Sequence, residues 1–103
     1  MLKRVTVLRR RDDVDGDVAV DHWMTTHAEL VHRVPGVVRY VQRPCTASAD
    51  SASDPALLGI GEVWFESRDD AVAATEAPEW STVVDDARTF AILPPVAVCW
   101  VDE

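Results

Sequence analysis

Apolar and β-branched residues cluster in four short segments of the chain, and each cluster predicts a β-strand. The predicted strands are residues 3–10, 37–43, 59–67 and 95–103. Between the first two strands, apolar residues recur at helical spacing from Ala19 to Val34. Asp15 is the candidate N-cap of that helix, and Pro35 ends it because a residue before proline is pushed out of the helical region.

The second half of the chain repeats this alternation of strand and helix. Residues 68–77 predict a short helix, and Pro78 suits the first position of another helix with an apolar face. The order is therefore β-α-β-β-α(α)-β, which is the ferredoxin-like arrangement of the α+β class with one antiparallel four-stranded sheet. Residues 44–58 are small, polar and flanked by proline, so we expect a long loop that could close over a site.

The two faces of the predicted sheet are both largely apolar. In the third strand Ile60, Glu62 and Trp64 alternate with Val63 and Phe65. Helices cover only one face of such a sheet, and a bare apolar face would be unfavourable in water. We therefore expect a homodimer in which two sheets pack together.

Composition limits the classes of protein to consider. The 103 residues suit one domain spanning 1–103, and a hydrophobic content of 48% favours a folded chain. The net charge of -8 argues against nucleic acid and anionic membrane as partners. No stretch approaches a signal peptide or a membrane span, and the two cysteines fit reduced thiols in a cytoplasmic protein.

The predicted first helix carries all three histidines, and one of them falls on its apolar face. At roughly 100° per residue, His27 lies at the centre of the stripe formed by Trp23, Leu30 and Val34. His32 points to solvent and His22 lies at the flank. This spacing differs from the i, i+4 pair of a zinc helix, so we expect no metal site. His27 is then either a core residue with a satisfied hydrogen bond or an acid/base group at a cavity.

Four segments resemble the EthD family of dimeric α+β barrel proteins. The segment "HWMTTHAELV" resembles the helix motif W-x-x-x-H-A-x-L, and "VPGVVRYVQ" resembles P-G-x-x-x-Y. The segment "GIGEVWFES" resembles the family's third strand, and "APEWSTVVDDARTF" resembles its S-P-E-W helix start. The resemblance covers nearly the whole chain in the right order.

The resemblance implies a ligand cleft between sheet and helices, in a family that includes proteins tied to ether degradation, cofactor-free isomerases and polyketide-tailoring enzymes. The histidine and tyrosine that line this cleft in the methylmuconolactone methylisomerases match His27 and Tyr40. Those enzymes also use a further histidine and a cysteine, and residues 46–66 contain neither. This departure argues against the methylisomerase reaction itself.

Three more residues are candidates for substrate contact. Glu62 could orient His27 or receive a substrate proton, or it could pair with an arginine at the rim of the sheet, because a carboxylate among apolar groups is costly unless it is paired or exposed. Trp23 and Trp64 are core candidates that could also wall a flat ligand.

These observations support three functional hypotheses. The first is a homodimeric enzyme without metal or organic cofactor that isomerises, cyclises or dehydrates a small cyclic or aromatic organic acid or polyketide-like intermediate. In it, His27 is the acid/base and Tyr40 donates to the oxygen that gains charge. The second is a non-catalytic dimeric protein that binds a small molecule. The third is a haem-binding protein with His27 as axial ligand, since related dimeric barrels bind haem.

Overall fold

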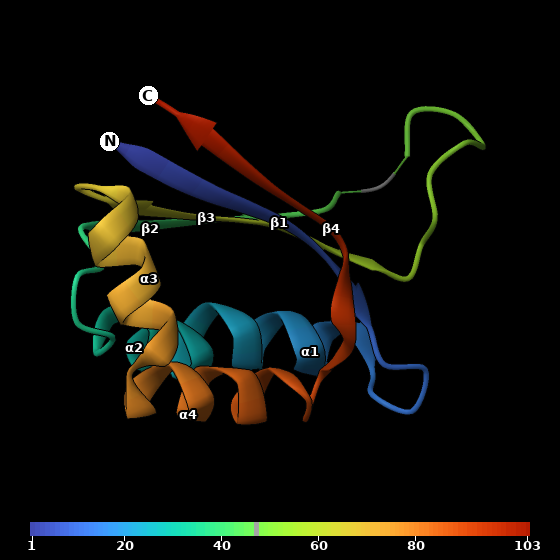
Figure 1. Ribbon diagram of the computed structural model, residues 1–103. Coiled ribbons are helices and arrows are strands. Elements are labelled where there is room, and N and C mark those ends of the chain that lie inside the picture. Colours follow the sequence, from blue (N-terminus) through green and yellow to red (C-terminus); the bar gives the residue numbers. More distant parts are fainter. Residues whose placement is uncertain (47) are drawn as a thin grey trace.

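The computed structural model describes residues 1–46 and 48–103. The strands are β1 (Leu2–Arg10), β2 (Arg39–Pro44), β3 (Leu57–Phe65) and β4 (Ala91–Asp102). The helical elements are α1 (Gly16–His22), η1 (Trp23–His27), α2 (Ala28–His32), α3 (Arg68–Glu76) and α4 (Pro78–Ala87). All helices lie on one side of the sheet, and its other face is bare (Figure 1). The ferredoxin-like α+β prediction is confirmed.

The sheet has strand order β2-β3-β1-β4, and all its pairs are antiparallel. The register places Arg4, Val63 and Tyr40 level with one another on the side of the helices. The next level on that side holds Thr6, Gly61 and Gln42. Strand β4 starts at Ala91, four residues before the predicted start, and pairs with the end of β1. Two prolines, at positions 94 and 95, fall inside β4, which lies at an edge of the sheet, where proline is tolerated.

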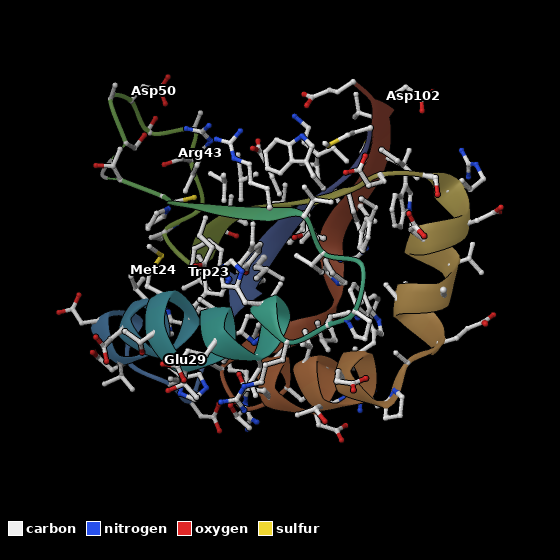
Figure 2. All side chains as sticks on the ribbon, turned by 90° about the vertical axis from the view of Figure 1, so that its left-hand side faces the viewer. Trp23, Met24, Glu29, Arg43, Asp50 and Asp102 are labelled. Carbon is white, nitrogen blue, oxygen red and sulfur yellow. The ribbon has the colours of Figure 1, made fainter. Side chains whose placement is uncertain are left out.

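The predicted first helix forms as one helical run with an unpredicted π-helical centre. Asp15 caps its start by accepting from the Asp17 N–H at 3.2 Å. The five residues of η1 have the wider i→i+5 turn, which occurs frequently at functional sites. Both Trp23 and His27 are buried in η1, at 0% and 5% exposure. Figure 2 shows Trp23 directed into the space between the helices and the sheet.

Two groups of buried side chains join the helices to the sheet. One contains Val31, Val63 and Phe65, and the other contains Trp23, Phe90 and Leu8. The Trp23 ring lies over Gly59, where an added Cβ would come within 2.7 Å of it. A side chain at that position would displace the indole, so the missing side chain lets the helical run approach β3.

The loop between β2 and β3 does not border the cavity described below, as far as residues 45, 46 and 48–56 are concerned. It extends past the end of the sheet away from the helices (Figure 1). Asp54 in this loop forms an ion pair with Arg9. The expected closure of this loop over the site therefore has no counterpart in this arrangement.

No helix in the described part of the chain is long and apolar enough to cross a membrane.

Candidate functional site

A cavity of about 460 Å³ lies between the sheet and the helices. Strand β1 contributes Arg4, Thr6 and Leu8, which share one face because side chains alternate along a strand. His27 enters from η1 and Tyr40 from β2, and the rest of the wall consists of apolar side chains of α2, β3, α4 and β4 together with Arg88, the residue after α4. The two residues that sequence analysis selected for chemistry thus line the same cavity.

His27 is held by a carboxylate that sequence analysis did not select. Its Nδ1 lies 2.9 Å from Asp86 Oδ2, and its ring packs edge-on against Phe90 with 5.2 Å between ring centroids. A carboxylate accepts hydrogen bonds, so Nδ1 carries the proton and Nε2 of a neutral ring keeps its lone pair. Asp86, from α4, therefore orients the imidazole. This is the function that had been considered for Glu62.

A second histidine shares the same carboxylate. His22 Nε2 lies 2.8 Å from Asp86 Oδ1 and 3.1 Å from Oδ2. Each carboxylate oxygen can accept from one imidazole, so Asp86 bridges the two rings. His22 is half-buried, whereas the His27 ring is almost fully enclosed.

Burial lowers the pKa of His27, although the hydrogen bond and the charge of Asp86 raise it in part. Desolvation disfavours the imidazolium, and this effect exceeds the support from the carboxylate. His27 is therefore neutral at pH 7. A neutral imidazole with Nδ1–H bound to a carboxylate is prepared to accept a proton at Nε2.

Tyr40 is fixed in a way that leaves its own proton available. Its hydroxyl oxygen accepts from Trp23 Nε1 at 3.2 Å, and the Gln42 amide donates to the Trp23 carbonyl at 2.7 Å. Burial raises the pKa of Tyr40 to about 12, so the phenol stays protonated at neutral pH. Gly61 leaves space on the sheet beside Tyr40 and Thr6, since a Cβ there would lie 3.8 Å from the Tyr40 hydroxyl and 3.0 Å from Thr6 Oγ1.

The other predicted site residues occupy different positions. Trp23 does not line the cavity, but its indole N–H donates to the Tyr40 hydroxyl. Glu62 and Trp64 lie on the bare face of the sheet, because they alternate with Val63, which faces the helices. Glu62 is 3.8 Å from Arg43 Nε, the rim pairing considered from the sequence, and Figure 2 shows Arg43 on that side. The Trp64 indole donates to Glu103 at 2.7 Å.

A weak signal for Asp86 was present in the sequence. With roughly 100° per residue, Asp86 lies at the border of the α4 apolar stripe, whereas Asp85 lies further round towards solvent. An acidic side chain at that border can point towards the core. Its partner could not be assigned, because helix pattern does not fix how α4 lies against η1.

Comparison with known proteins agrees with the fold and with the sequence motifs. The EthD domain model matches residues 11–93. An uncharacterized 11.0 kDa protein from the thcB-thcC intergenic region of Rhodococcus erythropolis is 27% identical over 71 residues, which cover 69% of this chain and 67% of that protein.

Two solved structures show the same fold. An EthD family protein from Bacillus halodurans has a TM-score of 0.77 at 18% identity, with 100% of this chain and 99% of that chain covered. A dimeric protein of unknown function and ferredoxin-like fold from Bacteroides fragilis has a TM-score of 0.67 at 13% identity, with coverage of 99% and 93%. On the match of the family model to most of its length, the chain belongs to the EthD domain family.

Proposed function

We propose that the chain is a small enzyme that transfers a proton within a compact cyclic or aromatic organic acid or polyketide-like intermediate, without metal or organic cofactor. One observation carries this proposal. A buried histidine that is oriented by a carboxylate lines a cavity large enough for a small molecule. A general base needs this combination of a fixed tautomer and access to substrate.

In the proposed step, His27 Nε2 removes a proton from a carbon next to a carbonyl group. The C–H bond breaks, and its electron pair moves to form an enolate whose negative charge rests on the oxygen. The Tyr40 hydroxyl donates to that oxygen. The imidazolium then returns the proton to another carbon, which isomerises the substrate, or to a departing oxygen, which dehydrates it. Asp86 supports the transient positive charge on His27.

The second candidate is a non-catalytic dimeric binding protein that uses the same cavity. The bridging of His22 and His27 by Asp86 favours it in one respect, because a fully hydrogen-bonded cluster also makes a rigid wall. In that case His27 contributes a fixed hydrogen bond to a ligand and no chemical step follows. The two candidates differ in whether a bound compound is converted.

A ligand screen with a His27→Gln variant tests the proposal. Lactones and aromatic acids that bind should raise the melting temperature of the wild type by about 4–8 °C for each kcal/mol of binding stabilisation. The variant should lose catalysis of exchange or isomerisation of the bound compound, followed by NMR in deuterated water. Glu29→Gln is the matched control, because Glu29 is exposed on the same helical run and does not line the cavity.

Retention of wild-type turnover by a folded His27→Gln protein contradicts the proposed base. Binding that depends on His27 without any conversion or exchange favours the binding protein. Circular dichroism of both variants shows that a loss of function is not a loss of fold.

We also propose that the functional unit is a homodimer built on the bare face of the sheet. This face carries Val5, Val7, Ile60, Val41 and Ala97, with basic side chains at its edges. A similar chain from Bacteroides fragilis is described as dimeric. Packing of two such faces would remove apolar surface from water and cover the sheet.

Replacing Val7 by glutamate should convert the dimer into a monomer. Val7 lies between Ile60 and Ala97 on the bare face, and a carboxylate there would be buried without a partner in the dimer. Light scattering measures the mass of the particle in solution. Val18→Glu is the matched control, because Val18 is 59% exposed on α1. A dimeric Val7→Glu protein would contradict this interface.

A further inference from the structure

The cavity has a charge that contrasts with the rest of the molecule. The chain carries a net charge of -8, yet two arginines, Arg4 and Arg88, line the cavity beside the neutral His27. No aspartate or glutamate is among the described lining residues. A concave site with basic groups and low-dielectric walls concentrates positive potential and attracts anions.

Arg4 differs from most other arginines of the chain in its surroundings. It is half-buried, and within the described residues its guanidinium makes no hydrogen bond and no ion pair. Four other arginines lie against carboxylates: Arg9, Arg11, Arg43 and Arg88. The N–H donors of Arg4 therefore have no acceptor among the described residues and are open to an anionic ligand.

Two indole rings hold the Arg4 side chain in place. The guanidinium carbon lies 5.2 Å from the ring centroid of Trp80 and 5.9 Å from that of Trp100. Cation–π contacts of this kind fix the direction of the planar group and leave its N–H edge free. Burial lowers the pKa of Arg4, yet a guanidinium keeps its proton at any physiological pH.

Arg4 also lies near the hydrogen-bond donor of the proposed reaction. Arg4 and Tyr40 flank Val63 at the same level of the sheet, and the positive charge of Arg4 acts to lower the pKa of Tyr40. The guanidinium and the phenolic O–H both present donors to one cavity. Most of the remaining wall is apolar, with Val31, Val83 and Leu93 among its members.

We propose that Arg4 is an anion-binding residue that holds the carboxylate of an organic acid in this cavity. The guanidinium fork matches the two oxygens of a carboxylate, while valine and leucine side chains contact the apolar body of the ligand. This inference rests on the proposed function and narrows its substrate class to anionic carboxylic acids. Arg4 selects and places the substrate, and His27 reacts with it.

Paired probes that differ only in charge test this inference. 1-Naphthoate and 1-naphthamide have the same rings and nearly the same size, so their affinities isolate the effect of the carboxylate. Calorimetric titration of the wild type should give binding of naphthoate about 10-fold or more tighter than binding of naphthamide. Naphthoate should also shift the Nε–H NMR signal of Arg4.

The preference for naphthoate should disappear in Arg4→Met, which keeps the length and apolar part of the side chain. Arg4→Lys, with its point charge, should keep part of the preference and serves if the methionine variant folds poorly. Arg33→Met is the matched control, because Arg33 is exposed and does not line the cavity. It should keep the full preference.

Three results overturn the anion site. They are equal binding of the two probes by the wild type, a preference that survives in Arg4→Met, and no movement of the Arg4 signal with either naphthoate or acetate. Inorganic phosphate that binds as tightly as naphthoate overturns the assignment to an organic acid.

The experiments can contradict the proposed function and this inference independently of each other. A preference for naphthoate that depends on Arg4 can persist in His27→Gln, and it then leaves a binding site without proton transfer. Conversely, equal binding of the two probes by the wild type, together with His27-dependent conversion of a neutral compound, would support the base and overturn the anion site.

Discussion

Replacing Asp86 by asparagine is expected to reduce turnover by roughly 10²–10⁴-fold, the range over which general acid/base groups act. The carboxylate accepts from His22 at one oxygen and from His27 at the other. An amide offers one oxygen and one NH₂ group, so one of the two imidazoles must face a donor. If this is His27, its proton moves to Nε2 and the base is lost.

The pH profile separates this effect from a loss of structure. The hydrogen bond and charge of Asp86 raise the pKa of His27 against the larger effect of burial. Without the carboxylate, the pKa of His27 should fall further below its ordinary value. The acid limb of kcat/KM should then move to lower pH while the plateau drops. ¹⁵N NMR of the imidazole reports the tautomer directly.

Asp85→Asn is the matched control for this substitution. Asp85 precedes Asp86 on α4 and loses the same charge when changed, but it is exposed and pairs with Arg88 at 3.2 Å. Its turnover and pH profile should remain close to wild type. A folded Asp86→Asn protein with unchanged turnover and tautomer would falsify the orienting function of Asp86.

Burial of His27 in its neutral form also makes the free energy of unfolding depend on pH. The pKa of His27 is lowered in the folded chain, so the unfolded chain binds more protons once the pH falls below about 6.5. The contribution of His27 to stability is complete above that pH and is lost as the pH falls through its lowered folded value. Neutral His27, the form that can act as a base, is present over the same pH range as this contribution to stability.

Local patterns predicted the strands and helices well because their signals lie within a few residues of each other. Asp15 illustrates this, since the predicted N-cap accepts from the Asp17 N–H at 3.2 Å. The apolar stripe also placed His27 correctly on the buried face. These features depend on the periodicity of one element at a time.

The candidate site was predicted only in part because it depends on how elements lie against each other. His27 and Tyr40 followed from the family resemblance and line one cavity. The contact of Asp86 with two histidines joins α4 to α1 and η1 across about sixty positions of sequence, and no local pattern encodes it. Glu62 and Trp64 were selected for substrate contact but lie on the face away from the helices. Alternation along a strand defines two faces, but it does not tell which of them the helices cover.

Arg4 could not be selected from sequence for a related reason. It lies in a basic N-terminal strand where arginine and lysine recur, and the sequence does not tell which face of that strand the helices cover. Alternation puts Arg4 on the helix side and Lys3 and Arg9 on the bare side. Only the packed structure reveals that it lacks a carboxylate partner among the described residues.

Trp23→Ala is expected to lower the free energy of unfolding by about 3–5 kcal/mol, a large share of the stability of a small domain. The Trp23 side chain is fully buried, lies over Gly59 and donates to Tyr40. Its removal leaves a void beside β3 and an unsupported hydroxyl. Urea denaturation followed by circular dichroism measures the change.

Trp23→Phe refines this test, because it keeps most of the ring and removes the indole N–H. Combined with Tyr40→Phe in a double-mutant cycle, it should show a coupling of about 0.5–1.5 kcal/mol, since both changes delete the same hydrogen bond. Trp100→Phe is the control, as Trp100 is 40% exposed, and it should show no coupling to Tyr40→Phe. Additive effects of Trp23→Phe and Tyr40→Phe would mean that the indole does not hold the phenol. The position of Tyr40 in the cavity would then rest on strand β2 alone.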